Sequence, residues 1–290
     1  MSDVSGEARF TVGDACVGCG ACTRVCPGQV LEMGPDGRPH MASYEGFGWN
    51  GCWKCQHCLS ACPVGAISIF GLRPEDSLAP CGPEEAAPVL DSLIANRHTC
   101  RRFLDKNVDR AVIDDMISRL GNAPNGGNKQ QVEFALIDDG DQMRAFRTAV
   151  RAEMEHLCEK GVYPEGFDRA SVDDMRRWEE RVRPDMLFCG APHLLVPHAP
   201  LGAGEPVADV NIACAYFELL CASRGLGCAM MTFPLGWLDL MPELKAWLHI
   251  PEGHYIAMPL GFGYPEIRYR CGSQRAIDPS RVTRLTFDAA

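Results

Sequence analysis

Two copies of one cysteine pattern constrain the fold of this chain more than any other feature. In each copy, three cysteines are separated by two residues, and a fourth follows after three more residues and precedes a proline. The copies comprise Cys16, Cys19, Cys22 and Cys26 before Pro27, and Cys52, Cys55, Cys58 and Cys62 before Pro63. Three thiolates at this spacing can surround one [4Fe-4S] cubane, while the fourth points away and serves a second cluster.

The spacing therefore predicts crossed ligation of two [4Fe-4S] clusters. We expect one cluster on Cys16, Cys19, Cys22 and Cys62, and the other on Cys52, Cys55, Cys58 and Cys26. A zinc ribbon or free thiols are the alternatives, but a zinc ion takes four ligands and does not need the third cysteine of each copy. The second copy has bulkier residues between its cysteines, for which packing is as good an explanation as tuning of the cluster: Trp53, Gln56 and His57.

The length and charge of the chain exclude several classes of protein. Its 290 residues suffice for two domains, and 46% hydrophobic residues can form a core. No apolar run reaches the roughly 18 residues of a membrane helix, and a net charge of -10 argues against nucleic acid as a partner. The segment Met1 to Val12 lacks the apolar region of a secretory signal. We therefore expect a cytoplasmic protein rather than a secreted disulfide scaffold.

The chain divides into two expected domains and a linker. Residues 1–70 hold both cysteine copies, residues 71–88 contain four prolines, and residues 89–290 alternate helical and strand patterns. Because each proline fixes φ and removes a backbone donor, the middle segment is typical of a linker or wrapping arm. The separated helices and strands of the third part predict an α+β domain.

Individual elements of the third part can be placed from their apolar patterns. Asp109 can cap a helix that ends at Gly121, and residues 142–160 predict an exposed, charge-rich helix. A third helix, 209–224, is apolar nearly all round, so we expect it to be covered on several sides and to end at Gly225. A helix is also expected just before Arg97, and strands are expected at 132–137, 194–196 and 255–260.

Three separated segments suit a phosphorylated heterocycle. Arginines and a hydroxyl between Arg97 and Phe103 match a phosphate monoester, although a short basic cluster is usually solvated surface. The glycines and amides between Ala123 and Gln130 can approach the edge of a planar ring, although the segment can equally be a simple turn. The stretch from Gly261 to Arg275 adds a second set of arginines.

These segments carry two family resemblances. Residues 8–70 resemble bacterial two-cluster ferredoxins. The three later segments, together with the stretch 209–227, resemble in order and spacing the nitroreductase family of FMN enzymes over residues 88–280. The segment Cys228 to Thr232 departs from that family, because it lacks the acidic residue and glycine that some members have there. The resemblance implies a ferredoxin-like domain followed by a nitroreductase-like FMN-binding α+β domain.

The nitroreductase resemblance also implies a homodimer with FMN at the subunit interface. It implies that the ribityl phosphate is held by Arg97, His98, Thr99 and Arg101, and that Arg275 with Arg268 or Arg270 completes the clamp. It further implies that the isoalloxazine ring is reached from the partner subunit by Pro124, Asn125, Gly126 and Asn128.

Together these features predict an iron–sulfur flavoprotein oxidoreductase. A low-potential donor such as ferredoxin would pass electrons through both clusters to FMN, which would reduce a small molecule: a nitro compound, a quinone or an activated double bond. One alternative is substrate oxidation with electrons leaving through the clusters; another is a non-catalytic electron carrier or redox sensor. No conventional acid–base pair is evident, so no catalytic residue is assigned.

Overall fold

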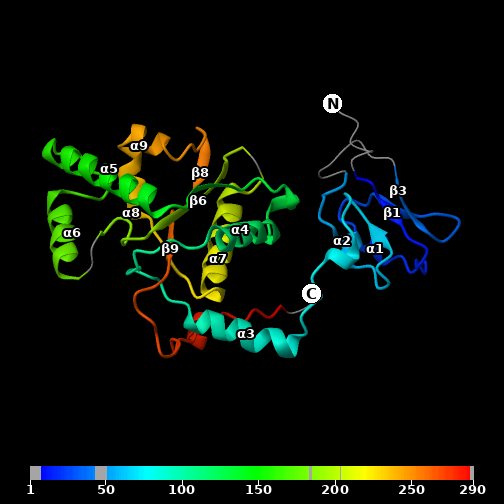
Figure 1. Cartoon of the computed structure of the whole chain (residues 1–290). Coiled ribbons are helices and arrows are strands. Elements are labelled where there is room, and N and C mark those ends of the chain that lie inside the picture. The colour runs from blue at the N-terminus through cyan, green and yellow to red at the C-terminus, as the bar shows by residue number, and fades with distance from the viewer. Residues whose placement is uncertain (1–7, 43–50, 183–184, 203, 288–290) are drawn as a thin grey trace.

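The computed structural model describes residues 8–42, 51–182, 185–202 and 204–287. Parts of the expected ferredoxin-like domain, residues 1–7 and 43–50, therefore lie outside the described residues, as does most of the segment Met1 to Val12. Figure 1 shows the chain as a small N-terminal unit with short helices and strands, and a larger unit in which helices surround a sheet.

The N-terminal unit is built from two short strand pairs. Strand β1 (Thr11–Val12) pairs antiparallel with β4 (Ile67–Ser68), and β2 (Leu31–Met33) pairs antiparallel with β3 (Pro39–Met41). Its core combines apolar side chains with cysteines from both copies: Val30, Leu31, Leu59, Ile67, Ile69, Cys22, Cys52 and Cys58. The cysteines are thus part of the packing of this unit.

The two cysteine copies fold into similar local structures. The first contains helix α1 (Ala21–Val25) and the second contains α2 (His57–Ser60). The residue before each helix is left-handed: Gly20 has a φ of 68° and Gln56 a φ of 60°. Glycine adopts this conformation without steric cost, whereas in a residue with a Cβ it costs about 1–2 kcal/mol. The second copy therefore keeps the loop shape of the first at some local strain.

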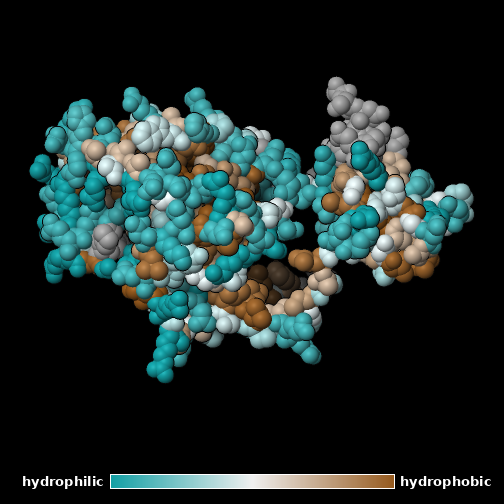
Figure 2. Space-filling view, in the orientation of Figure 1, coloured by the Kyte–Doolittle hydropathy of each residue, from teal (hydrophilic) through white to brown (hydrophobic). Residues whose placement is uncertain are grey.

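The segment between the units is partly helical. It contains a 3-10 helix (Pro74–Asp76) and the start of α3 (Pro83–Asn96), so the last residues of the expected linker 71–88 belong to a helix. Pro83 stands in the first turn, where its missing N–H is not needed. Within the described chain no residue of α3 is buried, and its apolar side chains are exposed: Val89, Leu90 and Ile94. Figure 2 shows this apolar surface over α3.

Five strands form the antiparallel sheet of the larger unit. The order is β5-β6-β9-β7. Strand β9 pairs with the first residues of β6, and β8 pairs with the last residues of β6. The strands are β5 (Glu133–Ile137), β6 (His193–Pro200), β7 (Gly227–Met230), β8 (His254–Ile256) and β9 (Leu260–Gly263). The α+β expectation for this part of the chain is confirmed.

Helices cover both faces of this sheet (Figure 1). Since neighbouring residues of a strand point to opposite faces, Leu195 belongs to one core and Leu194 to the other. The Leu195 core is covered by α4 (Arg110–Arg119) and α7 (Pro206–Ser223). The opposite core is covered by α5 (Gly140–Glu159), α6 (Arg169–Arg181), α8 (Phe233–Asp239) and α9 (Pro242–Ala246).

Several helix ends follow from local sequence. The side chain of Asp109 caps α4 by accepting from the N–H of Ala111 at 2.9 Å. Helix α7 begins at Pro206, three residues before the predicted start, and ends before the left-handed Gly225 (φ 69°). The N–H of Leu226 then bonds to the Cys221 carbonyl at 2.9 Å, which closes the helix end as a Schellman motif does.

Helix α5 differs from its prediction in its exposure. It begins at Gly140 because the side chain of Asp139 accepts from the N–H of Gln142 at 3.0 Å. The expectation of an exposed helix is wrong, since one face is buried along its whole length at helical spacing: Met143, Phe146, Val150, Met154 and Cys158. The many charges occupy only the opposite face.

The single strand predicted at 255–260 is also wrong, because the segment forms two strands, β8 and β9. His198 pairs with Ile256 and Leu195 pairs with Leu260, so three steps along β6 match four steps along the other segment. The extra residue interrupts the ladder as a β-bulge does. Pro259 lies in this break, where its missing N–H costs no ladder hydrogen bond.

Candidate functional site

The structure brings cysteines of both copies together. Cys62 lines one cavity with the first three cysteines of the other copy: Cys16, Cys19 and Cys22. Burial raises the pKa of the Cys22 thiol, and the neighbouring thiols of Cys62 and Cys16 add to this shift. Residues 16–22 and residue 62 therefore meet as the crossed pattern requires.

The second set of cysteines is crossed in the same way. Burial, together with the neighbouring thiols of Cys52, Cys55 and Cys26, raises the pKa of Cys58 to about 12. Cys26 comes from the first copy, and it also contributes to the raised pKa of Cys52, after burial and Cys55. A thiol must lose its proton before its sulfur can bind a metal. Metal binding at these cysteines would therefore release protons.

The spacing of the sulfur atoms fits a cluster better than a single ion. Four sulfurs 2.3 Å from one tetrahedral zinc ion lie about 3.8 Å from each other. Among the described residues, which include all 16 cysteines, no three cysteine sulfurs lie within 4.8 Å of one another. The cavity of Cys16, Cys19, Cys22 and Cys62, which small and apolar residues line, therefore suits a [4Fe-4S] cluster.

The first and third candidate flavin segments run side by side. The N–H of Glu266 donates to the Arg102 carbonyl at 3.1 Å, and the N–H of Ser273 donates to the Ala95 carbonyl at 2.8 Å. The ring of His98 stacks on Tyr269 with centroids 3.9 Å apart and planes within 10°. Residues 97–103 and 264–273, far apart in sequence, thus form one surface.

The arginines of this surface differ in their partners. Arg97 is half-buried and forms an ion pair with Glu218 of α7, Nε to Oε1, at 3.4 Å. Four others are exposed and, among the described residues, have no carboxylate within 4.0 Å: Arg101, Arg268, Arg270 and Arg275. Free guanidinium groups on adjoining segments can bind the oxygens of a phosphate, so the residues present fit the phosphate of FMN.

Beta strand β7 borders this surface. Thr99 forms a parallel bridge with Cys228, and the N–H of Cys100 donates to the Cys228 carbonyl at 2.8 Å. A Cβ on Gly227 would lie 2.5 Å from the Cys100 Cβ, so only glycine permits this close approach. The start of β7 therefore fixes the position of Thr99.

The second candidate segment, the loop 123–130, is anchored elsewhere. The N–H of Gly126 donates to the side chain of buried Asp209, at the start of α7, at 2.9 Å. The side chain of Asn125 accepts from the N–H of Gln130 at 2.9 Å, and Pro124 is exposed. The anchoring role of Asp209 was not predicted, although a carboxylate within an apolar helix was a visible signal of such a role.

The loop also contacts the N-terminal unit. The side-chain amide of Asn128 donates to the main-chain carbonyl of Trp53 at 2.8 Å. Trp53 lies between Cys52 and Cys55, so this bond joins the candidate flavin loop to a candidate cluster loop. The sequence pattern gave no indication of this pairing.

Within one chain the predicted phosphate residues and ring residues are anchored at separate points of α7. The loop 123–130 is anchored at Asp209 and Arg97 at Glu218, nine residues further along α7. At 1.5 Å per residue, these anchors are about 13 Å apart along the helix axis. The phosphate-type residues are thus anchored nearer the C-terminal half of α7, and the ring-type residues near its start.

The two units of the chain match two family models. Residues 15–66 match the 4Fe-4S dicluster domain, and residues 94–264 match the nitroreductase family. The chain belongs to the nitroreductase family. Its N-terminal part is a 4Fe-4S ferredoxin-type domain.

Solved nitroreductases share its fold. A nitroreductase with bound FMN from Desulfitobacterium hafniense is 21% identical, with a TM-score of 0.52 over 67% of this chain and 96% of that one. A nitroreductase with bound FMN from Bacteroides fragilis is 16% identical, with a TM-score of 0.52 over 68% of this chain and 98% of that one. At these identities the likeness concerns the fold.

Curated relatives match each unit separately. A ferredoxin from Pyrobaculum islandicum is 38% identical over 69 residues, which are 23% of this chain and 59% of that ferredoxin. Iodotyrosine deiodinase from Danio rerio is 24% identical over 184 residues, 60% of this chain and 59% of that enzyme. This nitroreductase-family chain thus spans 59% of the length of both relatives.

In its described part, no helix combines the length and apolar character that crossing a bilayer requires.

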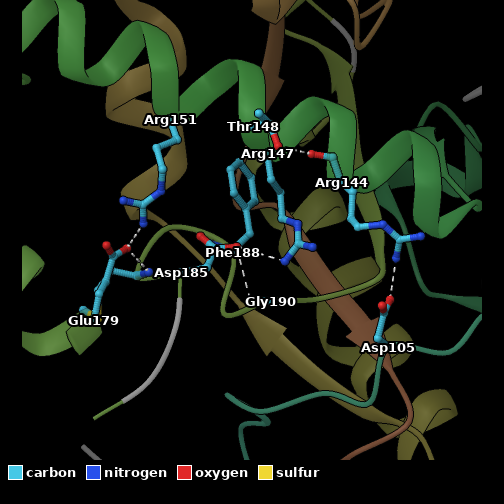
Figure 3. A network of polar contacts seen from close by, with 10 residues as sticks. Asp105, Arg144, Arg147, Thr148, Arg151, Glu179, Asp185, Phe188 and Gly190 are labelled. Carbon is cyan, nitrogen blue, oxygen red and sulfur yellow. Dashed lines mark hydrogen bonds and ion pairs between the residues drawn. The ribbon is translucent and has the colours of Figure 1, made fainter. Parts of the chain in front are cut away.

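An ionic network fixes the part of the nitroreductase domain between β5 and β6 (Figure 3). Arg147 of α5 pairs with Asp185 at 3.2 Å, and Asp185 accepts from the N–H groups of Phe188 and Gly190 at 3.0 and 3.2 Å. Arg151, one turn along α5, pairs with Glu179 of α6. These pairs hold α6 and the turn 185–190 against α5.

Proposed function

We propose that this chain is a homodimeric FMN oxidoreductase that receives low-potential electrons through two [4Fe-4S] clusters and passes them to a small organic acceptor. The observation that carries the proposal is the 2.8 Å hydrogen bond from Asn128 to the carbonyl of Trp53. It links the loop predicted to reach the flavin ring with a loop between two cluster cysteines. A nitroreductase domain driven by a nicotinamide alone would need neither the clusters nor this contact.

We expect the two proposed clusters to occupy different positions relative to the flavin loop. Trp53 is flanked by Cys52 and Cys55, so a cluster held by Cys52, Cys55, Cys58 and Cys26 would lie next to the flavin loop. The cluster held by Cys16, Cys19, Cys22 and Cys62 is then the entry point for an external donor such as ferredoxin. Cys16 is half-exposed and Cys19 exposed, which gives a donor access to that cluster.

Two chains are proposed to complete each flavin site. In one chain, the phosphate residues and the ring residues are anchored about 13 Å apart along α7. We infer that Arg97, His98, Thr99, Arg101, Arg268, Arg270 and Arg275 of one chain hold the phosphate. The second chain then supplies Pro124, Asn125, Gly126 and Asn128 to the ring.

Exposed apolar side chains support this assembly. Val89 and Ile94 of α3 are 61% and 56% exposed, and Val207 of α7 is 54% exposed. Near the C-terminus, Leu285 and Phe287 are 72% and 85% exposed. A second copy that covers these side chains would bury apolar surface at about 25 cal/mol per Å².

The chain's own residues then have distinct tasks in the reaction. When bound, FMN supplies hydride and single-electron chemistry. The arginines neutralise and fix its phosphate. The amides of Asn125 and Asn128 bond to Ala123, Gln130 and Trp53 and so hold the loop in a fixed shape for the ring. Exposed Lys129, next to Asn128, would stabilise negative charge at the ring edge.

All 16 cysteines are described and form no disulfide among the described residues, which supports a reducing compartment such as the cytoplasm.

An acceptor screen tests this proposal. The anaerobic protein is reduced stoichiometrically and mixed with nitroaromatic compounds, quinones and activated alkenes, while flavin reoxidation is followed by absorbance. Because one relative is named a deiodinase, 3-iodo-L-tyrosine joins the panel. Rapid reoxidation by one class, with product formed in the same amount, supports the proposal. Reoxidation by no member of the panel, with rapid electron exchange to ferredoxin, would instead identify an electron carrier.

A further inference from the structure

Three side chains outside the cluster and flavin sites converge on one point of the central sheet. Glu133 begins β5, His198 lies in β6 and His254 begins β8. One oxygen or nitrogen ligand atom from each lies within 4.8 Å of the others. None of the three belongs to the residues proposed for the clusters or for FMN.

The strand register explains why these side chains meet. Glu133 and His198 are directly opposite each other on β5 and β6, so they share a face of the sheet. His198 is opposite Ile256 on β8, and His254 lies two residues before Ile256, on the same face. Three neighbouring strands therefore present one carboxylate and two imidazoles together.

The distance between the two imidazoles suits a shared ion. The Nδ1 atoms of His198 and His254 are 2.8 Å apart. Nitrogens bound 2.0–2.1 Å from one ion at angles of 90–109° are about 2.9–3.4 Å apart, so a small adjustment would place both in coordination range. The pair can otherwise share a single proton in a hydrogen bond, which makes proton sharing the competing explanation.

The setting of the three residues also suits a cation. His198 is buried, His254 is half-buried and Glu133 is exposed at the rim. The carboxylate supplies negative charge, and buried imidazole supplies a rigid ligand. Two imidazoles and one carboxylate are a donor set of divalent first-row transition ions, in contrast to the oxygen-only sets of calcium and magnesium.

A cavity of about 290 Å³ adjoins these three residues. Glu133 and His198 line it, together with the rest of β5 and the segment Trp247 to His249 after α9. Three protein ligands leave at least one coordination position of an ion open, and a cavity beside them gives room for water or a small molecule there.

We propose that Glu133, His198 and His254 bind one divalent transition-metal ion per chain, with its open coordination position toward this cavity. The site takes zinc-type or iron(II)-type ions, and an oxygen donor from water or from a small ligand in the cavity completes the coordination.

The test uses Zn²⁺ as the probe and the full chain with its clusters assembled. Zinc uptake is measured by equilibrium dialysis and elemental analysis for the native chain, Glu133→Gln, His254→Gln and the control His249→Ala. His249 lines the same cavity but lies outside the triad. We expect one zinc per native chain and per control chain, and an affinity at least about tenfold lower in both triad variants.

Zinc X-ray absorption distinguishes the triad from the cluster cysteines. We expect a shell of nitrogen and oxygen neighbours at about 2.0–2.1 Å without sulfur at about 2.3 Å. Unchanged iron and FMN content confirms that the variants are folded. Absence of stoichiometric zinc, a sulfur shell, or equal affinity in all four proteins would overturn the proposal and leave the histidines as a hydrogen-bonded pair.

Discussion

The side-chain amide of Asn128 donates a hydrogen bond to the main-chain carbonyl of Trp53 at 2.8 Å. The two residues are 75 positions apart in sequence, and the bond joins the nitroreductase domain to the 4Fe-4S domain. A main-chain acceptor fixes the position of the loop itself, so the contact defines which cysteine loop faces the nitroreductase domain. The proposed electron path depends on this relationship.

Asn128→Asp should slow electron transfer from the clusters to the flavin. A carboxylate cannot donate to the Trp53 carbonyl and would repel it, so the two loops should separate. Rapid-mixing absorbance should show reduced clusters that accumulate before the flavin is reduced. Asn122→Ala is the matched control, because Asn122 is exposed and lies, like Asn128, between α4 and β5. FMN affinity is measured in both variants, because an equal loss of flavin and of rate would indicate a role in flavin binding alone.

Cys62→Ala should damage the cluster built on the first cysteine copy. Its thiol lines the cavity of Cys16, Cys19 and Cys22, so that cluster loses a ligand while the other keeps four. Iron analysis and low-temperature electron paramagnetic resonance should show one altered cluster. Cys26→Ala should alter the other cluster, and exposed Cys81→Ala should alter neither. Loss of the cluster of its own copy in either variant would contradict crossed ligation.

Arg97→Ala should lower FMN affinity several-fold or more. A charge-assisted hydrogen bond contributes about 1.5–3 kcal/mol, and Arg97 lies on the surface with the four unpaired arginines. Equilibrium dialysis of FMN against the apoprotein measures the change. Arg169→Ala, an exposed arginine of α6, is the control and should bind FMN normally. Riboflavin binding should differ little between Arg97→Ala and the native chain, since riboflavin lacks the phosphate.

Protonation of His193 should lower the free energy of unfolding as the pH falls below about 6.5. It is fully buried, its Nε2 accepts from the N–H of Val108 at 2.9 Å, and burial lowers its pKa. A lowered pKa means that the unfolded chain binds the proton more readily than the folded chain. The contribution of neutral His193 to the free energy of unfolding is therefore present above about pH 6.5 and is lost below it. The slope contributed by one group is at most about 1.4 kcal/mol per pH unit.

His193→Gln removes this titrating group and keeps an acceptor for Val108. Melting temperatures between pH 7.5 and 5.5 should fall less steeply for this variant than for the native chain. Exposed His156→Gln should retain the native slope. Parallel curves for all three proteins would mean that His193 does not control acid stability.

Features set by short-range sequence were predictable. The spacing of Cys16 to Cys26 and its repeat led to the crossed sets, and Asp109 marked the start of α4 because capping is a local interaction. The buried face of α5 was also present in the sequence, but its many charges obscured the helical spacing of Met143, Phe146 and Val150.

Features that depend on strand register or domain contact were not predictable. The break between β8 and β9 arises from pairing with β6, which no local pattern encodes. The convergence of Glu133, His198 and His254 needs the same register. The bond between Asn128 and Trp53 needs the placement of two units, and a polar side chain in a turn has many other possible partners.

Anaerobic stopped-flow reduction by reduced ferredoxin tests the central claim that the 4Fe-4S domain is the electron port. In the full chain, cluster absorbance should bleach before or together with the flavin. A chain that begins at Gly82, the residue before α3, should keep FMN and its dimeric state but lose rapid reduction by ferredoxin. Equally fast reduction of the truncated and full chains, or equally effective reduction of both by NADPH, would contradict the account.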